Sequence, residues 1–322
     1  KEEFKLGAFG GEGEQHPHSI ARCLNHPEYI YLSHDVGGSW CSTDNGETWN
    51  KNSDIGLYLQ FGQSVQVEPN NPDIVFIIVD PSYNYKVKNF NGLYRSEDGG
   101  THWELVLQTD TKIDRIYRSN IAYELSSVDI GNPIQTWFAA FANNGLYRSD
   151  DGGKSWGDSP VSSLEGHKII YEVKTHPVNE NIVYVASSLG LYKSSEKGVN
   201  LEKVNGLPED VTSVCINPNN PDSIFVTVKQ DGVYLSVDGG NTFSKNLDHP
   251  SLRMHMNYGF PEQLYLIGNN RNSKYSSDGG NTWNDTPEAN TFPGLGRESG
   301  WRRWVDGNMS AVVPNPTNKD EA

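Results

Sequence analysis

Short apolar runs separated by turn residues recur along the whole chain in a fixed order. An alternating segment ends in a proline turn, a continuous apolar run follows it, and a third segment begins with glycine. The first kind covers residues 19–27, 64–69, 171–177 and 213–218, the second covers 74–79 and 182–186, and the third covers 92–96 and 145–149. Such segments, bounded by Gly, Pro and Asn, are typical of β-strands. With a fourth strand after the third, each unit predicts a four-stranded antiparallel sheet.

One polar phrase, Ser-x-Asp-x-Gly-x-Thr-Trp, follows the third strand of each unit. Its six copies begin at residues 42, 96, 149, 194, 236 and 276, which are 54, 53, 45, 42 and 40 residues apart. A period of that size indicates a propeller or a solenoid. The phrase resembles the Asp-box, or BNR repeat, of sialidases, sortilin-type receptors and several polysaccharide-degrading enzymes. The resemblance implies an all-β fold, namely a β-propeller of four-stranded antiparallel blades with Asp-box turns.

The end of the chain bears on how the propeller closes into a ring of blades. Residues 310–316 repeat the phrase of the first strand, so a seventh blade begins there. We expect six complete blades plus the start or closure of a seventh, in a single β-propeller domain over residues 1–322. Either the natural protein continues beyond this sequence, or the segment 3–7 helps to close the ring.

The aspartates of the repeated phrase have a structural explanation. Aspartate accepts backbone N–H groups in a tight turn, glycine supplies a positive φ, and the final aromatic ring packs beneath the hairpin. Five copies keep the aspartate, at positions 44, 98, 151, 238 and 278, whereas the fourth copy, 194–201, has lost it. We therefore assign these carboxylates to the scaffold and not to a functional site.

Composition narrows the classes of partner. The net charge is -15, which argues against nucleic acid, because a surface that follows phosphates needs a basic excess. No apolar run approaches the length of a membrane span, so no membrane partner is expected. Three cysteines make no disulfide framework, and we expect free buried thiols. The chain begins without a signal peptide, so it is either cytosolic or a mature form. The sequons at Asn284 and Asn308 permit secretion, and we expect a secreted or extracellular protein.

Loops that join the second to the third strand, or one blade to the next, lie on the face opposite the boxes. Residues 80–88 and 297–304 are the richest of these loops, and seven of the ten arginines fall in such segments, Arg253 and Arg297 among them. Arginine matches carboxylates and sulfates, and tryptophan beside it stacks on sugar rings, although loops are also where charged residues ordinarily occur. The candidate substrate-binding residues are Tyr83, Tyr85, Arg115, Arg118, Arg271, Trp301, Arg302, Arg303 and Trp304.

One carboxylate departs from the repeat. Asp35 stands where the third blade has Ala142, and His34 stands where it has Phe141, at the end of a second strand on the loop-rich face. The Gly-rich run 9–13 and the phrase 31–40 resemble the opening of xyloglucanase-type tandem-propeller glycoside hydrolases. That resemblance, over about the first 50 residues, implies that Asp35 is the catalytic base. The family places its general acid in a second propeller, and His34, Trp40 and Cys41 depart from its phrase.

Three classes of function remain open. A glycoside hydrolase would pair Asp35 with Asp80, Glu298 or Asp306, with His34 beside the base. A polysaccharide lyase on a uronate or sulfated glycan would use arginines with a proton acceptor from His16, His18, His34, Tyr83 or Tyr85. A non-catalytic propeller would bind a protein or a glycan. We expect a polysaccharide or oligosaccharide partner, with hydrolysis preferred to elimination and a second propeller completing the site. No cofactor is expected, and the pair His16 and His18 lacks the spaced partner of a metal site.

Overall fold

The computed structural model describes residues 17–34, 38–57, 62–79, 90–109, 120–123, 133–141, 145–157, 169–268, 272–285 and 314–319. Every element assigned within these ranges is a β-strand, and none of the described residues forms a helix that could cross a membrane. The chain divides into two compact units, Lys1–Lys112 and Ile113–Ala322. The single domain expected from the sequence stays a prediction.

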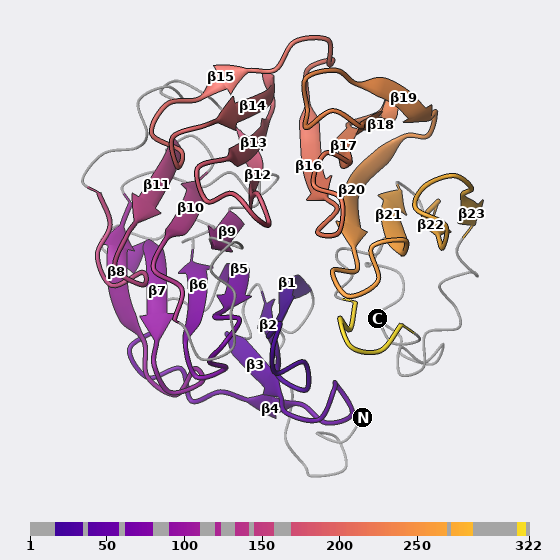
Figure 1. Ribbon diagram of the computed structural model, residues 1–322. Helices are drawn as coiled ribbons and strands as arrows, with labels where there is room; N and C mark the ends of the chain where they lie inside the picture. Colours follow the sequence, from indigo (N-terminus) through magenta and orange to yellow (C-terminus); the bar gives the residue numbers. More distant parts are fainter. Residues whose placement is uncertain are drawn as a thin grey trace. The chain divides into compact units, whose positions relative to one another are not determined.

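The first unit contains two four-stranded antiparallel sheets (Figure 1). In each sheet the strands pair in chain order, so every connection is a hairpin between neighbours. The first sheet consists of β1 (Pro17–Arg22), β2 (Ile30–His34), β3 (Ser39–Ser42) and β4 (Asn50–Lys51). The second consists of β5 (Gly62–Val67), β6 (Val75–Val79), β7 (Gly92–Ser96) and β8 (Glu104–Gln108).

The second unit contains four further sheets of the same kind. Its first sheet has three strands among the described residues, and the other three sheets have four strands each. The three-stranded sheet consists of β9 (Asn120–Tyr123), β10 (Trp137–Phe141) and β11 (Gly145–Ser149). The others consist of β12 (Ile170–Thr175), β13 (Val183–Ser187), β14 (Gly190–Ser194) and β15 (Glu202–Lys203); β16 (Val211–Ile216), β17 (Ile224–Val228), β18 (Gly232–Ser236) and β19 (Ser244–Leu247); and β20 (Ser251–Met256), β21 (Leu264–Gly268), β22 (Lys274–Ser276) and β23 (Asn284–Asp285). Six such sheets are the blades of an all-β propeller, which confirms the predicted fold class.

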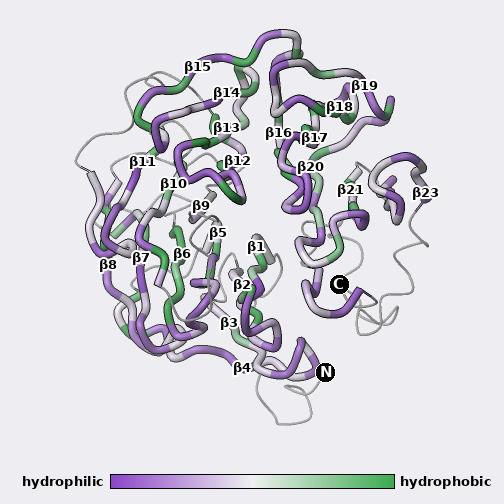
Figure 2. Tube along the Cα trace, in the orientation of Figure 1, coloured by the Kyte–Doolittle hydropathy of each residue, from purple (hydrophilic) through white to green (hydrophobic). Residues whose placement is uncertain are grey.

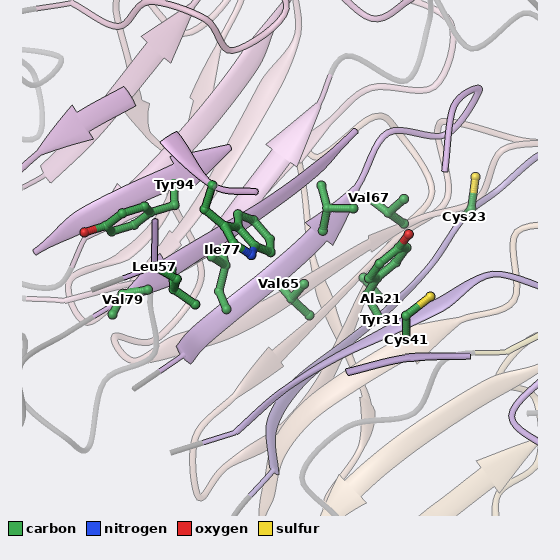
Figure 3. Close-up of a cluster of buried hydrophobic side chains, with 12 residues drawn as sticks. Ala21, Cys23, Tyr31, Cys41, Leu57, Val65, Val67, Ile77, Val79 and Tyr94 are labelled. Atoms are coloured by element: carbon green, nitrogen blue, oxygen red, sulfur yellow. The ribbon is translucent and has the colours of Figure 1, made fainter. Parts of the chain in front are cut away.

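The second strand of a blade is its most buried part. All five residues of β6, β10, β13 and β17 are buried, because both faces of each sheet are covered. These strands are accordingly rich in apolar residues, and β6 is hydrophobic along its length (Figure 2). Within the first unit, Ile77 and Val79 of β6 belong to one cluster with Val65 of β5 and with Ala21 and Tyr31 of the first blade (Figure 3). Burial of each such aliphatic side chain contributes about 1.5–3 kcal/mol.

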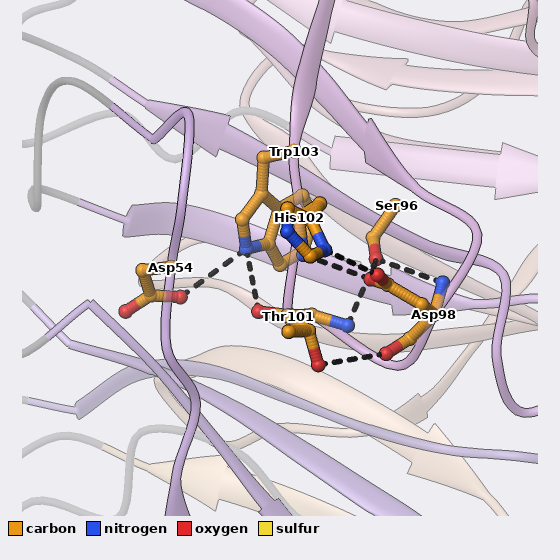
Figure 4. A network of polar contacts seen from close by, with 7 residues as sticks. Asp54, Ser96, Asp98, Thr101, His102 and Trp103 are labelled. Atoms are coloured by element: carbon orange, nitrogen blue, oxygen red, sulfur yellow. Dashed lines mark hydrogen bonds and ion pairs between the residues drawn. The ribbon is translucent and has the colours of Figure 1, made fainter.

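The Asp-box turns have the structure that the repeated phrase predicts. In the second box, Ser96 Oγ accepts the N–H of Gly100 at 2.9 Å, and Asp98 Oδ1 accepts the N–H of His102 at 2.8 Å (Figure 4). Trp103 Nε1 donates to the carbonyl of Gly100 at 3.0 Å, which fixes the indole under the turn. The same aspartate-to-backbone bond occurs at Asp44, Asp151, Asp238 and Asp278.

The fourth box keeps its turn without the aspartate. Ser194 Oγ accepts the N–H groups of Glu196 and Gly198, each at 3.0 Å, and Asn200 Nδ2 donates to Glu196 Oε2 at 2.6 Å. Lys197 and Gly198 have φ values of 51° and 79°, the left-handed pair found in the other boxes. A Cβ on Gly198 would come within 2.8 Å of the Phe138 ring, so glycine is required there for space as well as for φ. The serine and the glycine thus maintain the turn.

Residues 314–319 form a turn of the same kind as the one that joins the first and second strands in other blades. The N–H of Thr317 donates to Asn315 Oδ1 at 2.9 Å, as the N–H of Asn219 donates to Asn217 Oδ1 at 2.9 Å. The turn contacts the preceding blade, where Asn257 Nδ2 donates to the carbonyl of Asn315 at 3.0 Å. The repeat of residues 310–316 therefore carries the expected turn at its described end. The closure of the ring stays a prediction, and the segment 3–7 lies outside the described residues.

Candidate functional site

The structure describes little of the candidate site that the sequence predicts. Its backbone places His34 at the end of β2, and the other ten candidate residues lie outside the described ranges. These ten are Asp35, Tyr83, Tyr85, Arg115, Arg118, Arg271, Trp301, Arg302, Arg303 and Trp304. The suggested second carboxylates, Asp80, Glu298 and Asp306, also lie outside them, as does His16. His18 is placed by its backbone in β1.

The strands on either side of Asp35 are described, and they locate the phrase that contains it. His34 ends β2 opposite Pro17 of β1, and Ser39 begins β3 opposite Ser33 of β2. Residues 35–38 are therefore the connection between the second and third strands of the first blade. Asp35 itself lies outside the described residues, so its expected place at a strand end stays a prediction.

A buried carboxylate, Asp54, lies beside the end of that connection. Asp54 is 8% exposed and belongs to the segment between β4 and β5. Its Oδ1 accepts the hydroxyl of Ser39 at 2.6 Å and the indole N–H of Trp103 at 3.2 Å (Figure 4). Its Oδ2 accepts the N–H of Ser39 at 3.1 Å and forms an ion pair with Lys51 Nζ. Four donors thus satisfy the carboxylate, and Lys51 balances its charge.

Sequence reasoning missed Asp54 because nothing local marks it. Its backbone donor lies 15 residues away and its indole donor 49 residues away, so no short motif contains the pair. The segments between blades also differ in length and sequence, so the repeat provides no aligned position. One signal was present in the sequence. The residue after the glycine of the third strand is Leu93, Leu146, Leu191 or Val233 in other blades and Ser39 in the first.

A second group of charged side chains lies on the first strands of the second unit. Glu172 on β12 accepts the N–H of Val214 on β16 at 2.8 Å, and Lys174 Nζ lies 3.5 Å from its other oxygen. Ser213 of β16 accepts the N–H of Met254 on β20 at 3.0 Å in the same manner. Side chains at one repeat position therefore bind the backbone of the next blade. Arg253, expected in a loop, lies instead at that position in β20, so that part of the arginine prediction is wrong.

Three ionisable groups on β12, β16 and β20, namely Lys174, Cys215 and His255, have shifted pKa values. Burial and the nearby charges of Arg253 and Lys174 lower the pKa of His255 to about 3, so the imidazole is neutral. Burial and Glu172 raise the pKa of Cys215 to about 12. Burial by itself would lower the pKa of Lys174, but the Glu172 carboxylate outweighs it and raises that pKa. The Glu172 and Ser213 side chains join neighbouring blades.

The cysteines and the potential metal ligands can be located among the described residues. Cys23, Cys41 and Cys215 are all buried and free, which confirms the expectation from the sequence. Burial raises the pKa of Cys23 to about 12, so its thiol is not an ionised nucleophile. Within the described ranges, no group of three His, Cys, Asp or Glu side chains is placed to hold a metal ion.

Comparison with known proteins agrees with the fold and the boxes. Residues 40–51, which include the whole of the first box, match the BNR/Asp-box repeat family. The chain is 26% identical over 260 residues to xyloglucanase Xgh74A of Acetivibrio thermocellus, an alignment covering 66% of this chain and 29% of that protein. This protein is thus an Asp-box β-propeller with sequence similarity to a xyloglucanase.

Solved structures show the same fold at lower identity. The GH74 enzyme of Niastella koreensis superposes with a TM-score of 0.66 at 20% identity, covering 84% of this chain and 47% of that one. YCF48 from Cyanidioschyzon merolae superposes with a TM-score of 0.58 at 14% identity, covering 86% of this chain and 87% of that one. The chain spans less than a third of Xgh74A and less than half of the Niastella enzyme.

Proposed function

We propose that this chain is a propeller of a glycoside hydrolase that cleaves a polysaccharide, with xyloglucan as the first substrate to test. The observation that carries the proposal is the sequence similarity to a xyloglucanase over 66% of the chain. The phrase around Asp35, in the connection between β2 and β3, supports it from within the sequence. Similarity of fold alone would not support the proposal, because Asp-box propellers serve many functions.

In this proposal Asp35 is the general base. It takes a proton from a water molecule as the water oxygen bonds to the anomeric carbon, and the glycosidic bond to the leaving oxygen breaks. A second carboxyl group donates a proton to that leaving oxygen. In an enzyme of this inverting type the two carboxyl groups are about 6.5–9.5 Å apart, which leaves room for the water. His34, next to Asp35 in the chain, would lie beside the base.

The general acid comes either from Asp80, Glu298 or Asp306, or from a second propeller domain. We favour the second propeller, because the chain spans only 29% of Xgh74A and 47% of the Niastella enzyme. The aromatic and arginine residues of the loops would bind the glycan by stacking and by charge. Tyr83, Tyr85, Trp301 and Trp304 would stack on sugar rings, and Arg115, Arg118, Arg271, Arg302 and Arg303 would bind acidic groups. We also propose that the protein is secreted or extracellular, which its sequons at Asn284 and Asn308 permit.

The test compares the full-length protein with Asp35→Asn on a panel of glycans that includes xyloglucan and an acidic glycan. We expect new reducing ends from xyloglucan without absorbance near 232 nm, and a loss of about 10²–10⁴-fold in turnover for Asp35→Asn with folding intact. The variant should still bind xyloglucan oligosaccharides, since the amide keeps the shape of the carboxylate.

Other outcomes overturn the proposal in distinct ways. Absorbance near 232 nm from the acidic glycan, abolished by His34→Ala or Tyr83→Phe but not by Asp35→Asn, would establish a lyase. If the full-length protein neither cleaves nor binds any glycan, the chain is a propeller that binds another kind of partner. A normal turnover in Asp35→Asn on xyloglucan would keep the hydrolase and reject Asp35 as its base.

A further inference from the structure

His176 occupies a turn position at which neighbouring blades have asparagine. The turn joins β12 to β13, and the N–H of His176 donates to the carbonyl of Ile182 at 3.0 Å across its base. In the turn between β16 and β17, the N–H of Asn217 donates to the carbonyl of Ser223 at 3.0 Å in the same way. Each of the two residues precedes a proline. His176 and Asn217 are therefore equivalent residues of the fourth and fifth blades.

Both side chains accept backbone N–H groups from inside their own turn. Asn217 Oδ1 accepts the N–H groups of the residues two and three positions later, at 2.9 and 3.2 Å. His176 Nδ1 accepts the equivalent pair, the N–H groups of Val178 and Asn179, at 3.3 and 3.1 Å. Amide oxygens also accept the N–H two positions later in two further turns, at Asn257 and Asn315. The turn of the fourth blade thus depends on an imidazole nitrogen where these others depend on an amide oxygen.

An imidazole differs from an amide because it titrates near neutral pH. A neutral histidine has one donor and one acceptor nitrogen, so acceptance at Nδ1 requires the tautomer that carries its proton on Nε2. Protonation adds a proton to Nδ1 and turns the acceptor into a donor, which then faces two backbone N–H groups. An amide oxygen keeps its lone pairs in the same pH range. Mild acid therefore removes the acceptor of the turn at His176 and leaves it in place at Asn217.

The surroundings of His176 also disfavour the charged imidazole. The residue is 9% exposed, and burial lowers its pKa from the ordinary 6.5. The ammonium group of Lys193 on β14, which donates to the carbonyl of Gly239 at 2.8 Å, acts in the same direction. The carboxylate of Asp222, in the turn between β16 and β17, opposes these effects without overcoming them. Because the folded pKa lies below the unfolded one, this stability is complete above pH ~6.5 and is lost as the pH falls below it.

The turn at His176 is joined to the fourth Asp-box, the copy without the aspartate. The N–H of Lys197 in that box donates to the carbonyl of Asn181 at 2.9 Å, and Lys197 Nζ lies 2.7 Å from Glu180 Oε1. Lys197 has a φ of 51°, so its backbone belongs to the left-handed part of the box. The box and the turn of this blade are therefore held to each other, and a change in the turn reaches the box.

We propose that His176 is a pH-sensitive switch in the fourth blade, in which protonation of Nδ1 releases its two backbone donors and loosens the turn and the fourth box together. The asparagine turn of the fifth blade stays closed under the same conditions. The switch acts from pH ~6.5 down to ~5, the range in which histidine titrates. Box aspartates such as Asp151, with a pKa of about 2, remain ionised there.

The experiment compares the protein with His176→Asn, which restores the asparagine of the neighbouring turns, from about pH 8 to about pH 5. It needs no substrate. Amide hydrogen exchange at Val178 and Asn179 is divided by exchange at Asn219 and Asn220 in the same molecule, which cancels the ordinary pH dependence of exchange. In the parent this ratio should rise by about threefold to tenfold for each pH unit below ~6, and in His176→Asn it should stay constant.

The reciprocal variant is Asn217→His, which should transfer the pH dependence to Asn219 and Asn220 in the fifth blade. A ratio that stays flat in the parent would overturn the proposal. An equal rise in the parent and in His176→Asn would overturn it as well, because another group would then be responsible. A further measurement needs no variant: the nitrogen NMR spectrum of the parent at neutral pH should show His176 protonated at Nε2 and not at Nδ1. The opposite tautomer would contradict the proposal.

Discussion

Asp98 and Asp54 both accept hydrogen bonds around the second Asp-box, but they reach their donors over different stretches of chain. Asp98 binds groups two and four residues away, and its turn is exposed to solvent. Asp54 binds Ser39 and Trp103, which are 15 and 49 residues away, and is buried. The first arrangement forms within a single turn and repeats in blade after blade. The second forms only when two blades pack, as does the hydrogen bond from the Trp283 indole N–H of the sixth box to Asn246 Oδ1 of the fifth blade.

The largest expected difference between the two carboxylates is in stability. Asp54→Ala should lower the free energy of unfolding by about 3 kcal/mol, because it leaves the buried donors of Ser39 and Trp103 without an acceptor. Asp98→Ala should lower it by about 1 kcal/mol or less, since water replaces the aspartate at an exposed turn. Urea unfolding of both variants gives the two values. Equal losses would show that burial does not distinguish these carboxylates.

Strong acid should act mainly on the boxes. Burial opposes ionisation of Asp151, but the hydroxyl and N–H of Ser155, the hydroxyl of Ser149 and the N–H of Lys154 together outweigh it and lower its pKa to about 2 from the ordinary 3.8. Because the folded pKa lies below the unfolded one, this stability is present above pH ~4 and is lost as the pH falls toward ~2. Allowing for solvent screening, about 1 kcal/mol is involved.

The variant Asp151→Asn tests this effect in urea unfolding measured from pH 6 to pH 2. It should be less stable than the parent at pH 6, and the difference should shrink toward pH 2 as the parent carboxylate becomes protonated. A difference that stays constant across the series would mean that the hydrogen bonds do not depend on ionisation.

The smallest expected effect is the repair of the fourth box. Glu196→Asp places a shorter carboxylate at the position where the other boxes bind the backbone N–H four residues later. We expect a gain of a few tenths of a kcal/mol, because the turn already exists through Ser194 and Gly198. A rise of about 1 °C in Tm is the measurable signature. Glu196→Gln, which keeps the length of the side chain, is the control, and a loss of stability in Glu196→Asp would contradict the prediction.

Much of the fold could be predicted because its signals are local. The alternating first strand, the apolar second strand and the glycine before the third strand each lie within about six residues, and the Asp-box turn within eight. The structure places strands at Gly62–Val67, Val75–Val79 and Gly92–Ser96. The second and third lie within the predicted segments, and the first begins two residues before the predicted segment 64–69. Arg253 was misplaced because a short strand with charged residues resembles a loop when its neighbours are unknown. The predicted substrate-binding residues and Asp35 stay predictions, since they lie outside the described residues.

By itself the sequence determined the class of fold, the number of repeats, the turns that carry the Asp-boxes and the departure of Asp35 from the repeat. The Asp-box turns depend on side chains that bind their own segment, so the phrase that encodes each turn also contains its partners. The tertiary structure alone decided that Asp54 is buried, that Ser39 and Trp103 meet on it, and that Glu172 and Ser213 bind the backbone of the next blade. Those contacts join residues about 15 to 50 positions apart, and only the packing of one blade on another brings them within hydrogen-bond distance.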